Sequence, residues 1–330
     1  MSALEVRDLR VQYRQAGPGA RRFPAVDGVD FTVGAQEMLG LVGESGCGKT
    51  TLGRAILGLV PVAQGEVRWG GQRIDDLSAG AFRPLRRELQ CVFQDPHACL
   101  DPRMTIAESV AEPLRALERS LAAAGRSERA LERLAEVGLG ADVAGRYPHQ
   151  LSGGQLQRAV IARALVVDPR FVVCDEPVSA LDVSVQGQIV SLLERVRVER
   201  RLGSLFISHN LAVVARLCER VLVMYRGRIV EAGPRGRVVG APRHPYTREL
   251  LDAVPAVDPG ARSRLRQRVT RALPPVEAAG GGCPFAARCL HAVTLCRAER
   301  PALRRLPTGQ DVACHRADEW PQGLPSLESP

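Results

Sequence analysis

Hydrophobic and polar residues alternate near the N-terminus, which is typical of strands with one buried face. Residues 4–13 carry apolar side chains at about every second position, and residues 29–33 repeat the alternation. We expect these segments to form an antiparallel pair. The Gly-, Pro- and Arg-rich residues 17–25 between them are expected to form a loop.

A second pattern consists of short, unbroken apolar runs bounded by Gly, Asp or Ser. Such runs are typical of strands buried on both faces of a parallel sheet. They occupy residues 38–42, 89–93, 171–174, 205–208 and 221–224.

Helical spacing of apolar residues lies between these runs. It occurs at 51–57, at 189–196 and at 130–137, where Ser127 is the expected cap and Gly138 the expected end. Residues 96–164 show no strand pattern and are expected to form a helical insertion. Alternating strands and helices predict an α/β fold.

Composition narrows the setting. Hydrophobic residues make up 45% of the chain, which is ample for a core, and no apolar run is long enough to span a bilayer. The charged N-terminus has no signal-peptide pattern, so we expect a cytoplasmic protein. A net charge of +9 fits a nucleic-acid partner, an anionic membrane face or simply a solvated surface. The basic residues are spread out, which argues against a dedicated nucleic-acid stripe.

Lysine occurs once among the 45 Lys and Arg residues, at Lys49. It lies in a G-x-x-x-x-G-K-[ST] pattern between the run 38–42 and the helical run 51–57, which is the context that a phosphate-binding loop requires. Lys49 is expected to reach the β- and γ-phosphates, where a planar guanidinium would not fit, and Thr50 to bind Mg²⁺. The expected nucleotide-binding residues of the loop are Gly43, Glu44, Ser45, Gly46, Cys47, Gly48, Lys49, Thr50 and Thr51.

Two acids end the apolar run 171–174. Carboxylates at the end of a buried strand are costly unless a cation lies there. We expect Asp175 to hold Mg²⁺ and Glu176 to orient or deprotonate the attacking water.

The sequence Leu-Ser-Gly-Gly-Gln at 151–155 resembles the signature motif of the ABC ATPase family, and the resemblance covers about residues 3–250. It implies a P-loop NTPase fold with a RecA-like parallel sheet core, an N-terminal antiparallel β subdomain and an α-helical subdomain. It also implies that the signature contacts ATP held by a partner subunit. The signature residues are Ser152, Gly153, Gly154 and Gln155.

The resemblance assigns four further residues. Gln94 is similar to the Q-loop glutamine, which joins Mg²⁺ and the water to the helical subdomain. Asp182 is similar to the D-loop aspartate at the dimer interface, and His209 to the switch histidine at the γ-phosphate. Tyr13 resembles the aromatic residue that stacks on adenine, although it could instead pack the small sheet near Phe23.

Three stretches resemble ATPase subunits of dipeptide/oligopeptide importers more closely. They are Phe-Gln-Asp-Pro at 93–96 with Leu-Asp-Pro-Arg-Met at 100–104, Tyr-Pro-His-Gln at 147–150, and His-Pro-Tyr-Thr-Arg at 244–248. A Cys-rich tail follows. We expect an ATPase domain at 1–253 with its helical subdomain at about 96–164, an extended linker at 254–282, and a small Cys-rich C-terminal region at 283–330.

Four tail cysteines, Cys283, Cys289, Cys296 and Cys314, fall in a segment with few large apolar residues, so a cross-link or metal is expected to stabilise it. Disulfides do not suit the cytoplasm, and the spacing contains no C-x₂-C pair of a routine zinc ribbon. Four thiolates suit a [4Fe–4S] cluster, which the resemblance to the importer subfamily also implies. Zinc and a metal-free tail stay open.

The expected function is that of an ATP-binding and ATP-hydrolysing subunit, with Mg²⁺, on the cytoplasmic face of the membrane. The resemblance implies a second ATPase subunit, with a paralogue favoured, two transmembrane permeases and an extracytoplasmic solute-binding protein. Dipeptides or oligopeptides are the expected solutes, with nickel, another small solute or export as alternatives. A nucleic-acid-acting ABC ATPase fits least, because the segment between Lys49 and Ser152 is too short for a long coiled coil.

Overall fold

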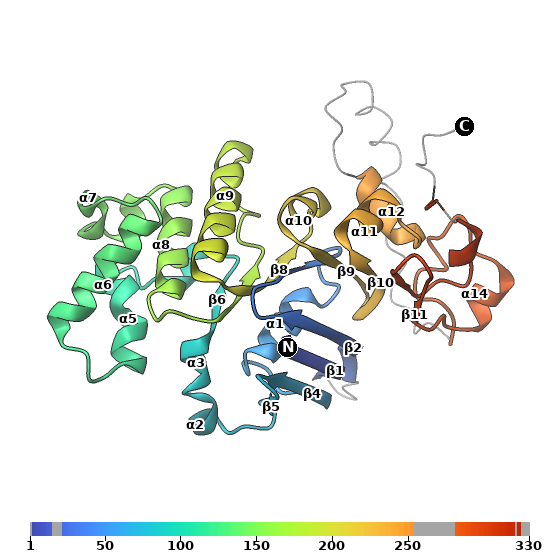
Figure 1. Ribbon diagram of the computed structural model, residues 1–330, viewed down its shortest axis with the longest axis horizontal. Helices are drawn as coiled ribbons and strands as arrows, with labels where there is room; N and C mark the ends of the chain where they lie inside the picture. The colour runs from blue at the N-terminus through green and yellow to red at the C-terminus, as the bar shows by residue number, and fades with distance from the viewer. Residues whose placement is uncertain (1, 15–21, 254–280, 321, 325–330) are drawn as a thin grey trace. The chain divides into compact units, whose positions relative to one another are not determined.

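The structure is a computed structural model that describes residues 2–14, 22–253, 281–320 and 322–324 (Figure 1). These residues form two compact units. The first comprises residues 1–39 and 50–208, and the second comprises residues 40–49 and 209–330. Most of the linker expected at 254–282 lies outside the described residues.

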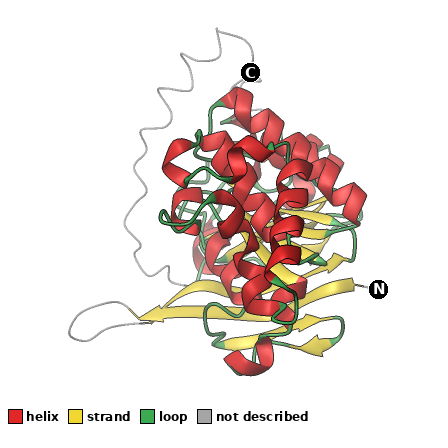
Figure 2. Ribbon diagram, turned by 90° about the vertical axis from the view of Figure 1, so that its left-hand side faces the viewer, coloured by secondary structure: helices red, strands yellow, loops and turns green. Residues whose placement is uncertain are grey.

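An antiparallel sheet of four strands begins the first unit. Strands β1 (Ser2–Arg14), β2 (Arg22–Gly34), β4 (Gln64–Trp69) and β5 (Gln72–Arg73) lie in the order β2-β1-β4-β5. Figure 2 shows the long β1–β2 pair in yellow. The predicted pairing is confirmed, and the alternating side chains of β1 bury one face. The prediction of a loop at 17–25 is wrong for residues 22–25, which belong to β2; Phe23 there pairs with Tyr13.

Three of the unbroken apolar runs form parallel strands in the first unit. Strand β7 (Phe171–Asp175) lies between β6 (Leu89–Val92) and β8 (Gly203–Ser208), parallel to both. Every residue of β7 and β8 is buried, as the runs predicted. The run at 38–42 is strand β3 (Met38–Val42), which is also buried throughout.

Residues 96–164 contain helices and no strand, which confirms the helical insertion (Figure 1). Ser127 does not cap a helix: α6 begins four residues earlier, after Ala122, because the intervening residues are compatible with a helix. Gly138, with φ of 77°, follows the end of α6 as predicted. The insertion consists of α4 (Pro96–Cys99), α5 (Ile106–Leu117), α6 (Ala123–Glu136), α7 (Ala141–Ala144), the 3₁₀ turn η1 (Pro148–Gln150) and α8 (Gly153–Leu165).

The other helices of the first unit flank its strands in the sequence. They are α1 (Lys49–Ile56), whose first residue belongs to the second unit, α2 (Ala79–Phe82), α3 (Leu85–Glu88) and α9 (Val183–Arg200). No helix in the described ranges combines the length and apolar character needed to cross a bilayer.

The second unit contains an antiparallel set of strands. Strand β9 (Arg220–Tyr225) pairs with β10 (Arg228–Pro234), which pairs with β12 (Asp311–Val312), and β12 pairs with β11 (Arg304–Arg305). The run at 221–224 is a buried strand, as predicted, but its pairing with β10 is antiparallel rather than parallel. The remaining elements are α10 (Leu211–Leu217), α11 (Arg235–Gly240), α12 (Pro245–Asp252), α14 (Thr294–Ala298) and the 3₁₀ turn η3 (Ala317–Glu319).

The C-terminal region packs on β10 and α12 rather than standing apart (Figure 1). Leu306, Val312 and Ala317 form a small core, and Cys314 packs against it. Phe285 is buried against the rings of Tyr225 and Tyr246. The few apolar residues of the tail therefore gain burial from the rest of the second unit, which the sequence analysis did not anticipate.

Candidate functional site

The phosphate loop follows β3 in the second unit. A Cβ atom on Gly43 would lie 2.2 Å from the carbonyl oxygen of Met224, so only glycine fits this close approach. Gly48 has φ of 111°, which also favours glycine. Lys49 is 4% exposed, and its Nζ donates to the carbonyl oxygens of Gly43 at 2.7 Å and Glu44 at 2.9 Å. The ammonium therefore lies inside the curve of the loop.

A hydroxyl and a carboxylate meet in the first unit. Thr50, the second residue of α1, donates from Oγ1 to Oδ1 of Asp175 at 3.0 Å. Asp175 ends the buried strand β7 and is itself only 4% exposed. Hard oxygen donors of this kind suit Mg²⁺, which is often held by one or two protein oxygens together with phosphates and waters. The two residues thus fit the metal expected from the sequence.

Glu176 follows immediately and is held in an unusual conformation. Its φ of 47° lies in the left-handed region, which is rare for a residue with a side chain. Its backbone N–H donates to the carbonyl of Ile207 at 3.0 Å, and its Oε2 accepts from Nε2 of Gln94 at 3.4 Å. The backbone turn separates the carboxylate of Glu176 from that of Asp175. Gln94 and Glu176 are therefore brought together in the first unit.

The Leu-Ser-Gly-Gly-Gln motif lies at the start of α8, a 13-residue helix. Ser152 is the N-cap: its hydroxyl accepts from the Gln155 N–H at 3.4 Å, and Gln155 accepts from the Ser152 N–H at 3.0 Å. Ser152 and Gly153 are exposed, so this helix N-terminus faces outward with its dipole and N–H groups. Gly154 permits close packing, because a Cβ there would lie 2.7 Å from a methyl of Val185.

Three other predicted residues lie at exposed or half-exposed positions. Asp182 is exposed and is the N-cap of α9, although its side chain makes no capping bond. His209 directly follows β8 and is exposed. Tyr13 is half-buried, and its ring centroid lies 6.0 Å from that of the exposed Phe23. The two rings form a small aromatic surface on the antiparallel sheet.

The four tail cysteines line one cavity of about 20 Å³, together with His244, His291 and Trp320. The backbone N–H of Cys283 donates to the carbonyl of Cys296 at 2.8 Å. Burial raises the pKa of the Cys314 thiol to about 12 and also raises the pKa values of Cys283 and Cys289. Within the described residues, no three His, Cys, Asp or Glu side chains are arranged to hold a metal ion.

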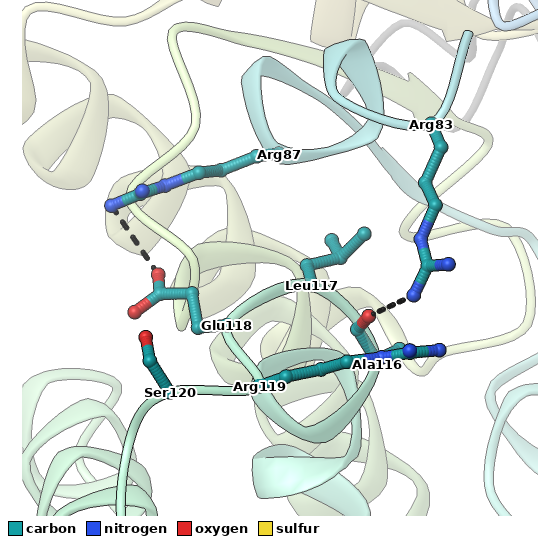
Figure 3. Close-up of a pocket in the computed structure, with 7 residues that line it drawn as sticks. All are labelled: Arg83, Arg87, Ala116, Leu117, Glu118, Arg119 and Ser120. Carbon is teal, nitrogen blue, oxygen red and sulfur yellow. Dashed lines mark hydrogen bonds and ion pairs between the residues drawn. The ribbon is translucent and has the colours of Figure 1, made fainter. Parts of the chain in front are cut away.

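Two surface hollows lie beside the helical insertion. One, of about 480 Å³, is lined by Arg83, Arg87 and the end of α5 (Figure 3). There Arg83 donates to the carbonyl of Ala116 at 2.7 Å, and Arg87 pairs with Glu118 at 3.3 Å. The other, of about 510 Å³, is more apolar and includes Leu59, whose side chain is 48% exposed.

The residues that attach the C-terminal region to the phosphate loop could not be predicted from the sequence. Arg288 forms a two-pronged ion pair with Glu44, at 2.9 and 2.8 Å, and the hydroxyl of Tyr246 accepts from the Glu44 N–H at 2.7 Å. The His-Pro-Tyr stretch resembles importer ATPases, but nothing in the local pattern links it to a loop 202 residues away.

The phosphate loop and the acids after β7 define a P-loop ATPase, and comparisons with known proteins place it more closely. The ABC transporter family matches residues 26–179, and the oligopeptide/dipeptide transporter C-terminal region matches residues 230–296. The oligopeptide transport ATP-binding protein OppF of Haemophilus influenzae is 45% identical over 88% of each chain. A putative peptide import ATP-binding protein of Brucella abortus is 46% identical over 94% of this chain and 91% of its own.

A glutathione import ATP-binding protein, GsiA of Salmonella typhimurium, is 54% identical over 75% of this chain and 39% of its own. Among solved structures, the ATP-binding cassette MJ0796 bound to ADP and Pi has a TM-score of 0.64 and 29% identity, covering 70% of this chain and 98% of that one. The chain belongs to the ATP-binding subunits of the ABC transporter family, in the branch that carries the oligopeptide/dipeptide transporter C-terminal region.

Proposed function

We propose that this chain hydrolyses ATP to energise a membrane importer of dipeptides or oligopeptides. The single observation that carries the ATPase chemistry is the 3.0 Å contact between the Thr50 hydroxyl and the Asp175 carboxylate, beside the Gln94–Glu176 pair. The names of its relatives and the match to the oligopeptide/dipeptide C-terminal region support peptide import. Import of nickel or another small solute, and export, are the alternatives.

Separate residues bind the nucleotide and the metal ion. Lys49 and the N–H groups of the loop other than that of Glu44 bind the phosphates, and Tyr13 stacks on adenine. Thr50, Asp175 and Gln94 hold Mg²⁺, which supplies charge neutralisation of the phosphates.

Glu176 orients the water, because its carboxylate is fixed at the end of a rigid strand and by Gln94. His209 contacts the γ-phosphate. The other loop residues complete the phosphate site, and they are Gly43, Glu44, Ser45, Gly46, Cys47, Gly48 and Thr51.

The site is shared between two subunits. Ser152, Gly153, Gly154 and Gln155 form a helix N-terminus whose first two residues are exposed, which suits the γ-phosphate of ATP held by a second ATPase subunit. The exposed Asp182 is placed at the same interface. We infer that the partner is a paralogue of this chain.

We also propose that the apolar hollow beside the helical insertion receives a segment of a transmembrane permease. Its lining combines exposed apolar side chains, such as Leu59, with arginines such as Arg86 and Arg163, and it includes Phe93, next to Gln94. Movement of a segment seated there would reach Glu176 through Gln94. Two permeases and an extracytoplasmic solute-binding protein complete the importer, and the chain binds the cytoplasmic face peripherally.

The proposed function suits a chain of three segments. The ATPase domain is proposed at 1–253, with its helical subdomain at about 96–164. A linker at 254–282 leads to the C-terminal region at 283–330.

The gathering of Cys283, Cys289, Cys296 and Cys314 around one cavity supports a [4Fe–4S] cluster held by their thiolates, with zinc as the alternative. The fit is partial, since the cavity is little larger than one water molecule, so the side chains must move apart to admit a cluster. Iron and acid-labile sulfide in anaerobically purified protein test this. About four irons per chain, lost in Cys283→Ser, are expected for a [4Fe–4S] cluster; iron-free protein after reconstitution would exclude it.

Transport is tested by reconstituting the chain with its permeases and binding protein in vesicles. Peptide-loaded binding protein is expected to stimulate ATP turnover and peptide uptake, whereas Lys49→Ala should abolish both. Stimulation by Ni²⁺ and not by peptides would overturn the peptide assignment and leave the ATPase in place. Leu59→Asp is expected to uncouple turnover from uptake while the isolated chain keeps its ATP binding.

A further inference from the structure

The C-terminal region holds the phosphate loop through one arginine. Arg288 lies between the tail cysteines Cys283 and Cys289 in the sequence, and its side chain is 15% exposed. Nη1 donates to Oε2 of Glu44 at 2.9 Å, and Nη2 donates to Oε1 at 2.8 Å. This two-pronged geometry fixes the direction as well as the position of the carboxylate.

The backbone of the same loop residue is also held. The N–H of Glu44 donates to the hydroxyl of Tyr246, and the Tyr246 ring is fully buried, 4.6 Å from the ring of Tyr225 and 5.6 Å from that of Phe285. Tyr246 cannot shift without disturbing this aromatic cluster. Glu44 is thus anchored through its side chain and its N–H, one residue after Gly43.

A second carboxylate completes the arrangement around the arginine. Nη2 of Arg288 also donates to Glu249, which lies on α12. Arg288 further lies over the rings of Phe285 and Tyr225, at 5.4 and 5.9 Å from their centroids. These contacts restrict the guanidinium to one position, so Arg288 can hold the Glu44 carboxylate in place.

We propose that Arg288 is a positioning residue for ATP binding, which neutralises the Glu44 carboxylate and keeps it turned away from the phosphates. This inference rests on the proposed role of the loop as the ATP site. A carboxylate next to the loop repels a triphosphate, and the repulsion grows where water is partly excluded. Without Arg288, the negative charge of Glu44 would act on the nucleotide directly.

The test compares the full-length Arg288→Ala, Glu44→Gln and double variants in ATP turnover and in binding of a fluorescent ATP analogue. Arg288→Ala is expected to raise KM and the analogue Kd by about three- to ten-fold, with kcat changed much less. Adding Glu44→Gln should recover most of that loss, because the uncompensated charge is gone. Arg288→Lys, which keeps the charge without the two-pronged geometry, should fall between.

Arg304→Ala is the matched control, because Arg304 lies in the same region and pairs with Asp318 rather than with the loop. It should leave KM unchanged. Unchanged KM in Arg288→Ala, or a raised KM that Glu44→Gln does not reduce, would overturn the proposal, since a merely unfolded tail would not be rescued at Glu44. Wild-type protein that binds no ATP would instead overturn the proposed function.

Discussion

The side-chain amide of Gln310 donates to the carboxylate of Glu231 at 3.0 Å, and neither residue is exposed to solvent. The same amide donates to the carbonyl of Ala241 at 2.9 Å. Glu231 also accepts from the backbone N–H groups of Arg243 and His244. A buried acid on β10 is therefore satisfied by the tail and by the segment before α12.

This burial predicts a pH-dependent stability. Desolvation raises the pKa of Glu231 to about 7 from 4.5. A carboxyl whose folded pKa is raised stabilises the fold fully below its unfolded pKa, and that contribution is lost as pH rises from about 4.5 through 7. Relative to Glu231→Gln, the wild type should lose about 1–3 kcal/mol over this window.

Thermal unfolding between pH 4.5 and 8 measures this difference. Glu231→Gln is expected to be less stable overall, because the new NH₂ group would face N–H donors that now bond to the carboxylate. The change of stability with pH is therefore the informative quantity. Glu199→Gln, at an exposed position on α9, is the control and should follow the wild type. Parallel slopes for wild type and Glu231→Gln would refute the assignment.

Replacing the single lysine by arginine should abolish hydrolysis despite the unchanged charge. The Lys49 ammonium is buried and bonded to two loop carbonyls, and a planar guanidinium does not fit that space. Lys49→Arg is expected to lower ATP turnover by about 10²-fold or more, with the fold retained. Arg54→Lys, on the exposed side of α1, should keep near-normal turnover; comparable losses in both would argue against a specific role for Lys49.

Neutralising Glu176 should separate ATP binding from hydrolysis. Glu176→Gln keeps the size of the side chain and an oxygen that can accept from Gln94, but it removes the base. Turnover should fall by about 10²- to 10⁴-fold, with affinity for an ATP analogue little changed. Glu132→Gln, exposed on α6, provides the comparison. Substantial residual turnover in Glu176→Gln would show that another group activates the water.

Two neighbouring glycines of α8 should respond differently to alanine. A Cβ on Gly154 would lie 2.7 Å from Val185, whereas a Cβ on Gly153 would meet only Leu181 at 3.4 Å. Gly154→Ala should cost about 1–3 kcal/mol of stability through overpacking. Gly153→Ala should be neutral or slightly stabilising, since alanine favours a helix. Denaturant unfolding of both variants tests this, and equal stabilities would contradict the close packing.

Local sequence patterns predicted most of the buried strands, because strand formation and burial depend largely on neighbouring residues. The buried runs form β3, β6, β7 and β8. The acids lie at the carboxyl end of β7, which is where functional residues of a parallel sheet are usually found. Strand β10 went unpredicted because Glu231 interrupts its apolar run, and the partner that makes its burial possible, Gln310, lies 79 residues away. The pairing of Arg288 with Glu44, 244 residues apart, has no local signal either.

The pairing of β12 with β10 has a consequence for solubility. An uncovered β10 would expose a row of backbone N–H and carbonyl groups on a strand buried along most of its length, and such edges recruit strands from other molecules. The tail blocks that edge with two strands of only two residues each, which offer little template for further addition. A chain shortened before residue 283 would therefore risk self-association even with its ATPase motifs intact.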